Sequence, residues 1–308
     1  MSGCYAVFHK QLGDLVLLEP CLSRLRDHHG APVRLLTRSG HAPLAELMSG
    51  VQFVRGLPLA PAGQLYCFDP LNKSAMRSLF APALFRKFVP AERRELRWFH
   101  PILFPRVQTP DLGESYVAEF FWTHAPVPAK APFRPPKLDR PPEAWAPPGR
   151  VPGSYLLVNP TAGWRHKSWT ADGWSQILKA LDEPALLTGA GSDWQVAQCH
   201  EIAGKAGGQV ESIASSTSLR EYLWLCANAR AVLTVDGAAS HLAAAFGVPC
   251  LTLFGPTNIR NWHRPAPGHV AIQAPTGNDG HCRVRNLDPA AVLEAAQRLL
   301  SDDLEPTP

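Results

Sequence analysis

A dense run of prolines divides this sequence into two parts. Ten prolines lie between Pro126 and Gly153. Because proline lacks a backbone N–H group and fixes φ, neither a helix interior nor a central strand tolerates this density. We therefore predict an extended, semi-rigid linker over residues 126–153, with a proline-rich motif for a partner as the alternative. A chain of 308 residues then forms two domains, residues 1–125 and residues 154–308.

In both parts, short apolar runs alternate with longer segments. The short runs predict strands, and the longer segments predict helices. In the first domain we expect strands at residues 5–8, 33–37, 51–55 and 64–68, and helices at 15–28, 41–48 and 114–124. In the second domain we expect strands at 155–159, 185–188, 231–235 and 249–254, and helices at 171–181, 194–206, 218–227, 237–246 and 289–300. This alternation predicts the α/β class, with a parallel sheet covered by helices on both faces. Pro20 would fall in the first turns of its helix, where proline is tolerated. The last helix could pack against the first domain.

The composition is that of an ordinary folded protein. Hydrophobic residues make up 45% of the chain, which is ample for two packed cores. The 7 cysteines are scattered without the C-x-x-C spacing of zinc or redox sites, which fits a reducing compartment. The first residues lack the basic start and apolar core of a signal peptide, and no apolar run is long enough to span a membrane. We therefore expect a cytoplasmic protein.

The charge of the chain is mildly basic, with a net value of +4. This excess suits a phosphorylated substrate or peripheral contact with an anionic membrane. It is too small to indicate nucleic-acid binding, and no aromatic-basic RNA motif accompanies it. Lys73 and Arg77 belong to a basic region that could contact phosphates of an acceptor, with a solvated basic face as the alternative.

The segment from Thr234 to His241 is the strongest candidate for a ligand site. It places Asp236 at the end of a buried strand and directly before a helix of small residues. Ligands of open α/β sheets bind at such strand ends, and a helix N-terminus offers N–H groups to a diphosphate. Gly237 allows close approach of the ligand to the backbone. The alternatives are a helix-capping role for Asp236 and a packed or capping role for His241.

Two further loops follow the first strand of each domain, and we expect both to face a ligand cleft between the domains. Asp14 ends the first loop and is a candidate general base, or else an acid favoured by the helix dipole. Lys167 ends the second loop and is a candidate diphosphate contact, or else a solvated cation. Thr161 and Gly163 of the same loop could add a hydroxyl group and a close backbone contact.

Other motifs carry weaker signals. Thr188-Gly189-Ala190-Gly191 follows a predicted strand but is only part of a dinucleotide-binding fingerprint, so Thr188 and Gly189 are secondary candidates for the donor site. The chain contains no H-E-x-x-H, G-x-S-x-G or P-loop motif and no paired D-x-D that would chelate a metal ion. We therefore expect neither a metal site nor a cofactor.

Four short motifs occur in order along the chain: Gly13-Asp14 to Pro20, Lys167-Ser168-Trp169, Asp236 to His241, and Phe254-Gly255-Pro256-Thr257. They resemble the G-D-x-(apolar)-P, K-x-W, D-x-x-x-x-H and F-G-x-T elements of glycosyltransferase family 9, the ADP-heptose:lipopolysaccharide heptosyltransferases. The resemblance covers almost the whole chain, and four motifs in register are more specific than any one of them.

The resemblance implies a GT-B fold, in which two Rossmann-like domains face each other across a cleft. It implies inverting, metal-independent transfer of heptose from ADP-heptose to a lipopolysaccharide-core or other glycan acceptor. The acceptor would bind the first domain, near Gly13, and the nucleotide-sugar would bind the second. By position, Asp14 matches the proposed catalytic base, Lys167 the contact to the donor phosphate, and Asp236 the contact to the donor sugar.

This chain departs from the family pattern beside the third motif. Family members usually carry Asp-Thr-Gly where this chain has Asp236-Gly237-Ala238, so a hydroxyl group is lost and the glycine is displaced. Two alternatives therefore stay open. One is a GT-B enzyme with another nucleotide-sugar donor or with epimerase activity, and the other is a non-catalytic protein that binds nucleotide-sugars.

Overall fold

The computed structural model describes residues 3–56, 63–68, 86–88, 112–189, 191–277 and 279–301. The chain divides into two compact units, Met1–Asp139 and Arg140–Pro308. The boundary falls inside the proline-rich segment. Within the described residues, no helix is both long enough and apolar enough to cross a membrane.

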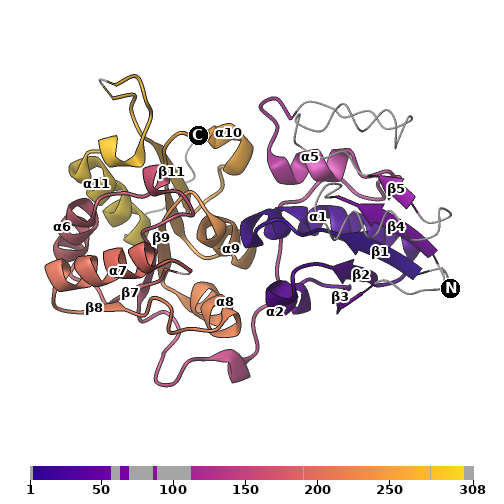
Figure 1. Cartoon of the computed structure of the whole chain (residues 1–308), viewed down its shortest axis with the longest axis horizontal. Coiled ribbons are helices and arrows are strands. Elements are labelled where there is room, and N and C mark those ends of the chain that lie inside the picture. The colour runs from indigo at the N-terminus through magenta and orange to yellow at the C-terminus, as the bar shows by residue number, and fades with distance from the viewer. Residues whose placement is uncertain are drawn as a thin grey trace. The chain divides into compact units, whose positions relative to one another are not determined.

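The first unit is built on a parallel sheet of five strands in the order β3-β2-β1-β4-β5. The strands are β1 (Gly3–Val7), β2 (Val33–Leu36), β3 (Val51–Val54), β4 (Gly63–Cys67) and β5 (Arg86–Phe88). The helices among the described residues of this unit are α1 (Leu12–His29), α2 (Ala42–Glu46) and α5 (Val117–Thr123). Helices α1 and α5 lie side by side, and α2 packs near β3 (Figure 1). Lys73 and Arg77 lie outside the described residues.

Helix α1 begins three residues earlier than its sequence pattern predicts. The helix includes Gly13 and Asp14, so Pro20 lies in its interior, and the expectation that Pro20 sits in the first turns is wrong. Proline there removes one backbone hydrogen bond of the helix. Pro20 and its apolar neighbours on α1 are buried, so tertiary packing holds the helix despite that loss.

A buried ion pair attaches the first part of the proline-rich segment to α1. Glu19 is only 2% exposed, and its carboxylate accepts hydrogen bonds from both terminal nitrogens of the Arg134 guanidinium at 2.7 and 2.9 Å. The backbone N–H of Lys137 donates to the same carboxylate at 3.0 Å. A buried carboxylate needs such charge-assisted partners. This part of the segment is therefore held against the first unit by specific contacts.

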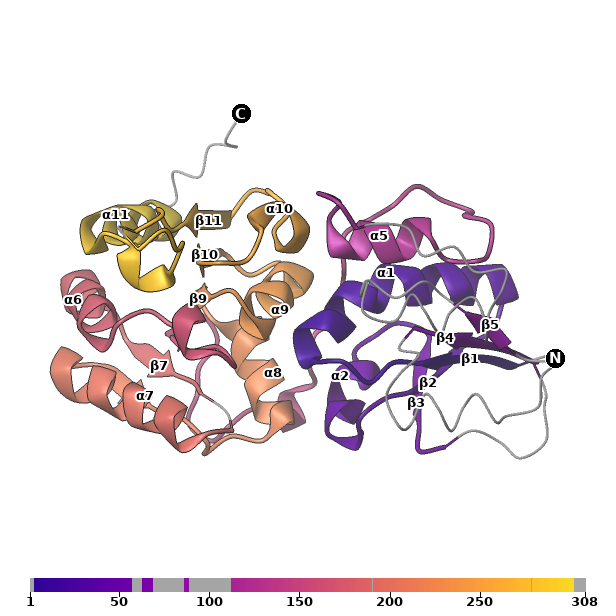
Figure 2. The same cartoon turned by 45° about the horizontal axis from the view of Figure 1, so that its top comes forward.

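The second unit contains a parallel sheet of six strands in the order β11-β10-β9-β6-β7-β8. The strands are β6 (Leu156–Asn159), β7 (Ala185–Leu187), β8 (Val210–Ser212), β9 (Ala231–Val235), β10 (Cys250–Phe254) and β11 (His269–Gln273). The helices are α6 (Ala171–Leu181), α7 (Asp193–Ala206), α8 (Leu219–Asn228), α9 (Ala238–Phe246), α10 (Ile259–Trp262) and α11 (Pro289–Leu300). Helices α6, α7 and α11 cover one face of this sheet, and α8 and α9 cover the other (Figures 1 and 2).

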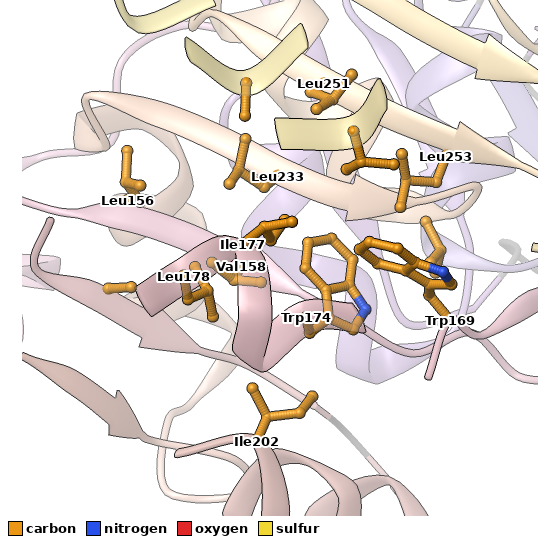
Figure 3. Packing of buried hydrophobic residues seen from close by; sticks show 14 of the residues in the cluster. Leu156, Val158, Trp169, Trp174, Ile177, Leu178, Ile202, Leu233, Leu251 and Leu253 are labelled. Carbon is orange, nitrogen blue, oxygen red and sulfur yellow. The ribbon is translucent and has the colours of Figure 1, made fainter. Parts of the chain in front are cut away.

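A core of the second unit lies between its sheet and the helices α6, α7 and α11. Trp174 and Ile177 of α6 pack on strand residues such as Val158 and Leu233, and all four side chains are fully buried (Figure 3). Helix α11 packs on α6 and on β9, β10 and β11 of its own unit. Because both sheet faces are covered, the central strands read as continuous apolar runs.

Candidate active site

The central feature of the second unit is an ion pair between Lys167 and Asp236. Lys167 Nζ lies 2.6 Å from Asp236 Oδ2, and Asp236 is only 5% exposed. Strands β6 and β9 are neighbours in the sheet, with Asn159 paired to Thr234, so the loops after both strands begin at the same edge. The topology thus brings together two residues that lie 69 positions apart in the sequence. This edge is where parallel α/β sheets bind ligands.

The Lys167 loop is anchored to the core by the residues that follow it. Trp169 is 2% exposed and packs edge-to-face on Trp174, with ring centres 5.3 Å apart. A Cβ atom on Gly173 would lie 2.7 Å from the Trp169 ring, so only glycine allows this contact. The Ser168 hydroxyl group accepts a hydrogen bond from the N–H of Ala162 at 3.2 Å. The tryptophan and serine of the K-x-W motif therefore fix the loop from which Lys167 projects.

A second network supports the beginning of the same loop. Thr161 is 5% exposed, and its hydroxyl group accepts a hydrogen bond from Gln195 Nε2 at 3.2 Å. Gln195 Nε2 also donates to the carbonyl group of Ala162 at 3.1 Å. No local sequence pattern pointed to Gln195, because its role depends on contacts made 33 and 34 positions away. Gly163 follows in the exposed part of the loop.

Thr188 and Gly189 lie at the end of the neighbouring strand β7. The Thr188 hydroxyl group is buried and donates to the carbonyl group of Val158 at 3.3 Å, so it ties β7 to β6. A Cβ atom on Gly189 would lie 3.0 Å from Cys199 Sγ on α7. Gly189 therefore allows close packing of α7 on the strand end.

Gly237 lies between Asp236 and the first residue of α9, and His241 lies on that helix. Gly237 is the N-cap residue of α9, and its carbonyl group accepts a hydrogen bond from the Ser240 hydroxyl group at 2.8 Å. His241 is 6% exposed, and its ring lies 6.1 Å from that of Trp262. Burial lowers the pKa of His241 to about 4, with Asp236 opposing this shift and Lys167 adding to it. His241 is therefore uncharged near neutral pH and can donate or accept a hydrogen bond without adding a positive charge.

The low pKa of His241 predicts acid-sensitive stability. An unfolded histidine has a pKa near 6.5, so protons favour the unfolded state as the pH falls from about 6.5 to about 4. Linkage then predicts that this residue lowers the free energy of unfolding by about 2 kcal/mol between pH 7 and pH 5. Urea titrations at both pH values should show that the free energy of unfolding falls less between pH 7 and pH 5 in His241→Gln than in the unsubstituted protein. His200→Gln, on the exposed side of α7, is the control and should behave like the unsubstituted protein. An equal loss in His241→Gln would contradict this role of His241.

Asp14 and Gly13 lie in the first unit, at the start of α1. Asp14 occupies the third position of the helix, and its Oδ2 accepts a hydrogen bond from the N–H of Gln11 at 3.2 Å. The preceding loop is held by Arg38, which donates from Nε to the carbonyl group of His9 at 2.7 Å. Asp14 is partly exposed, and its place in the helix fixes the position of the carboxylate. The carboxylate thus caps the N-terminus of α1.

Among the described residues, no group of three or more His, Cys, Asp or Glu side chains is arranged to hold a metal ion. The residues that the structure brings together in the second unit are an ammonium group, a carboxylate, a neutral imidazole and two loops with buried hydroxyl groups. This set can bind a phosphorylated ligand through Lys167 and can hydrogen-bond the hydroxyl groups of a sugar through Asp236.

The fold of this chain is similar to that of solved heptosyltransferase structures. The chain superimposes on the Escherichia coli ADP-heptose lipopolysaccharide heptosyltransferase II with a TM-score of 0.79, covering 97% of this chain and 98% of that one at 19% identity. This similarity and the two parallel α/β sheets confirm the predicted GT-B fold class.

Sequence comparison then gives the family. The model of glycosyltransferase family 9 (heptosyltransferase) matches residues 130–288, and the chain belongs to this family. Lipopolysaccharide heptosyltransferase 3 of Escherichia coli strain K12 is 30% identical over 168 residues, which are 50% of this chain and 48% of that protein. Lipopolysaccharide heptosyltransferase 1 of Pseudomonas aeruginosa is 35% identical over 123 residues, 39% of this chain and 33% of that protein. The chain thus matches about half the length, or less, of these curated relatives.

Proposed function

We propose that this protein is an inverting, metal-independent glycosyltransferase that transfers heptose from ADP-heptose to a lipopolysaccharide-core acceptor. The observation that carries the proposal is the contact between Lys167 and Asp236 at the carboxyl edge of the second sheet. Through this contact the lysine of the K-x-W motif meets the aspartate of the D-x-x-x-x-H motif. Membership of glycosyltransferase family 9 and the names of the matched relatives support the choice of heptose.

In this proposal the second unit binds the donor. Lys167 contacts the diphosphate and stabilises the charge that develops on the leaving ADP. The N-terminal N–H groups of α9 add to that stabilisation. Asp236 accepts hydrogen bonds from hydroxyl groups of the sugar, and neutral His241 supports the same region. Thr161 and Gln195 keep the loop in its binding geometry.

The first unit supplies the proposed base. Asp14 removes the proton from the attacking hydroxyl group of the acceptor, which forms the new glycosidic bond at the anomeric carbon as the bond to ADP breaks. Attack from the face opposite ADP inverts the anomeric configuration. Lys73 and Arg77 remain candidates for contacts with acceptor phosphates. A lipid-linked acceptor would bring the protein to a membrane surface, which we propose as its place of action within the cytoplasm.

A panel of nucleotides tests the choice of donor. We expect ADP to raise the melting temperature more than UDP, GDP or CMP, and equally well with magnesium or with EDTA. At 100 times its Kd, a ligand adds about 2.7 kcal/mol, which corresponds to roughly 5–10 °C for a unit of this size. A larger shift with another nucleotide would support a different donor, which the Gly237-Ala238 departure makes the leading alternative. No shift with any nucleotide would contradict the proposal.

A further inference from the structure

The loop that carries Lys167 also exposes a large aromatic side chain. Trp164 is 62% exposed, whereas Trp169, five residues later, is 2% exposed. Within the described part of the chain, Val151 is the other large hydrophobic residue with comparable exposure. An indole ring gains most of its stabilisation when its faces are covered. The structure thus leaves most of an indole side chain exposed in the loop that carries Lys167.

The position of the Trp164 ring relates it directly to that site. Lys167 Nζ lies 5.4 Å from the centre of the ring, in a cation–π contact. The same ammonium group lies 2.6 Å from Asp236 Oδ2. His166 packs beside the indole with ring centres 5.5 Å apart. One ammonium group therefore contacts both a buried carboxylate and an exposed aromatic face.

This combination suits a sugar. A sugar ring carries hydroxyl groups around its rim and C–H groups on its faces, so a carboxylate can bind the rim while an aromatic ring covers a face. Ligand sites commonly combine aromatic walls with a few placed polar groups in this way. If Lys167 holds the diphosphate, the transferred sugar and the ribose both lie within reach of the Trp164 ring, because each is bonded directly to a phosphate. Asp236, which the proposed function assigns to the transferred sugar, contacts the same ammonium group as the ring and so favours that sugar.

We propose that Trp164 is a specificity-determining residue that contacts the transferred sugar of the nucleotide-sugar. This inference rests on the proposed function. It assigns Trp164 to the sugar and not to the nucleotide, so it predicts that the two parts of the donor respond differently to the loss of the ring. Because Trp164 is well exposed, its substitution should change the melting temperature by no more than about 2 °C.

Calorimetric titration with ADP and with ADP-heptose tests the assignment. Trp164→Ala should bind ADP-heptose about 3- to 10-fold more weakly, the range of aromatic contacts, while its affinity for ADP stays within about 2-fold of the original. Trp164→Phe should recover most of the lost affinity, and Trp164→Leu should not. Val151→Ala, which removes the other exposed hydrophobic side chain, is the control and should bind both ligands normally.

The outcomes separate this inference from the proposed function. Equal weakening of ADP and ADP-heptose in Trp164→Ala would mean that the ring only positions Lys167 or stacks on the nucleoside, and would overturn the inference. Unchanged affinity for both ligands would overturn it as well. In either case the proposed function stands, because the unsubstituted protein binds the donor. If the unsubstituted protein binds neither ligand, the proposed function itself fails.

Discussion

Replacement of Asp14 by asparagine should lower the turnover number by roughly 10²- to 10⁴-fold, the usual contribution of a positioned general base. Asparagine keeps the size of the side chain and an oxygen that can accept the hydrogen bond from the N–H of Gln11. It cannot take a proton from the acceptor. Steady-state release of ADP in the presence of a heptose-deficient core acceptor measures the effect, and ADP titration of the same variant should give an unchanged Kd.

A matched acid tests whether this loss is specific. Asp172 also lies in the first turn of a helix, α6, and its side chain is 84% exposed. Asp172→Asn should retain the full rate. If Asp14→Asn turns over at nearly the original rate, Asp14 serves only to cap α1, and another group must act as the base.

Replacement of Lys167 by glutamine should weaken ADP binding by roughly 10- to 150-fold, because a charge-assisted contact contributes about 1.5–3 kcal/mol. The variant removes the positive charge but leaves an amide group that can still hydrogen-bond Asp236. Calorimetric titration with ADP measures the loss. Lys179→Gln, an exposed lysine on α6, is the control for a general loss of positive charge and should bind ADP normally.

Asp236 offers an independent check of the same ion pair. Asp236→Asn should weaken binding of ADP-heptose more than binding of ADP, because its carboxylate is assigned to the sugar. If Lys167→Gln leaves the affinity for ADP unchanged, Lys167 is a structural partner of Asp236 and the phosphate must bind elsewhere.

The sequence predicted best those elements that have strong patterns and clear ends. Strand β9 and helices α6 and α11 match their predicted bounds, because a fully apolar strand and amphipathic helices with Thr170 and Asp288 as N-caps leave little ambiguity. Strands β8 and β11 were not predicted. Both lie at edges of the sheet, where partial exposure weakens the apolar pattern. Helix α10 has four residues, too few for a periodic signal.

The candidate site was predictable where chemistry and strand ends coincide in the sequence. Lys167 and Asp236 each follow a strand of the predicted sheet, and the structure brings them together. The support of Thr161 by Gln195 and of Glu19 by Arg134 was not predictable, because each pair is joined only by the folded chain. The exposure of Trp164 was not predictable either, since tryptophan side chains are highly buried on average.

The most direct test of the central claim is a transfer reaction in EDTA. The protein is incubated with ADP-heptose and a heptose-deficient core oligosaccharide, and the acceptor is analysed by mass spectrometry. We predict an increase in mass of one heptose unit, with release of one ADP for each product formed and the same rate with or without magnesium. An unmodified acceptor under conditions in which ADP-heptose binds, or a strict requirement for magnesium, would contradict the account.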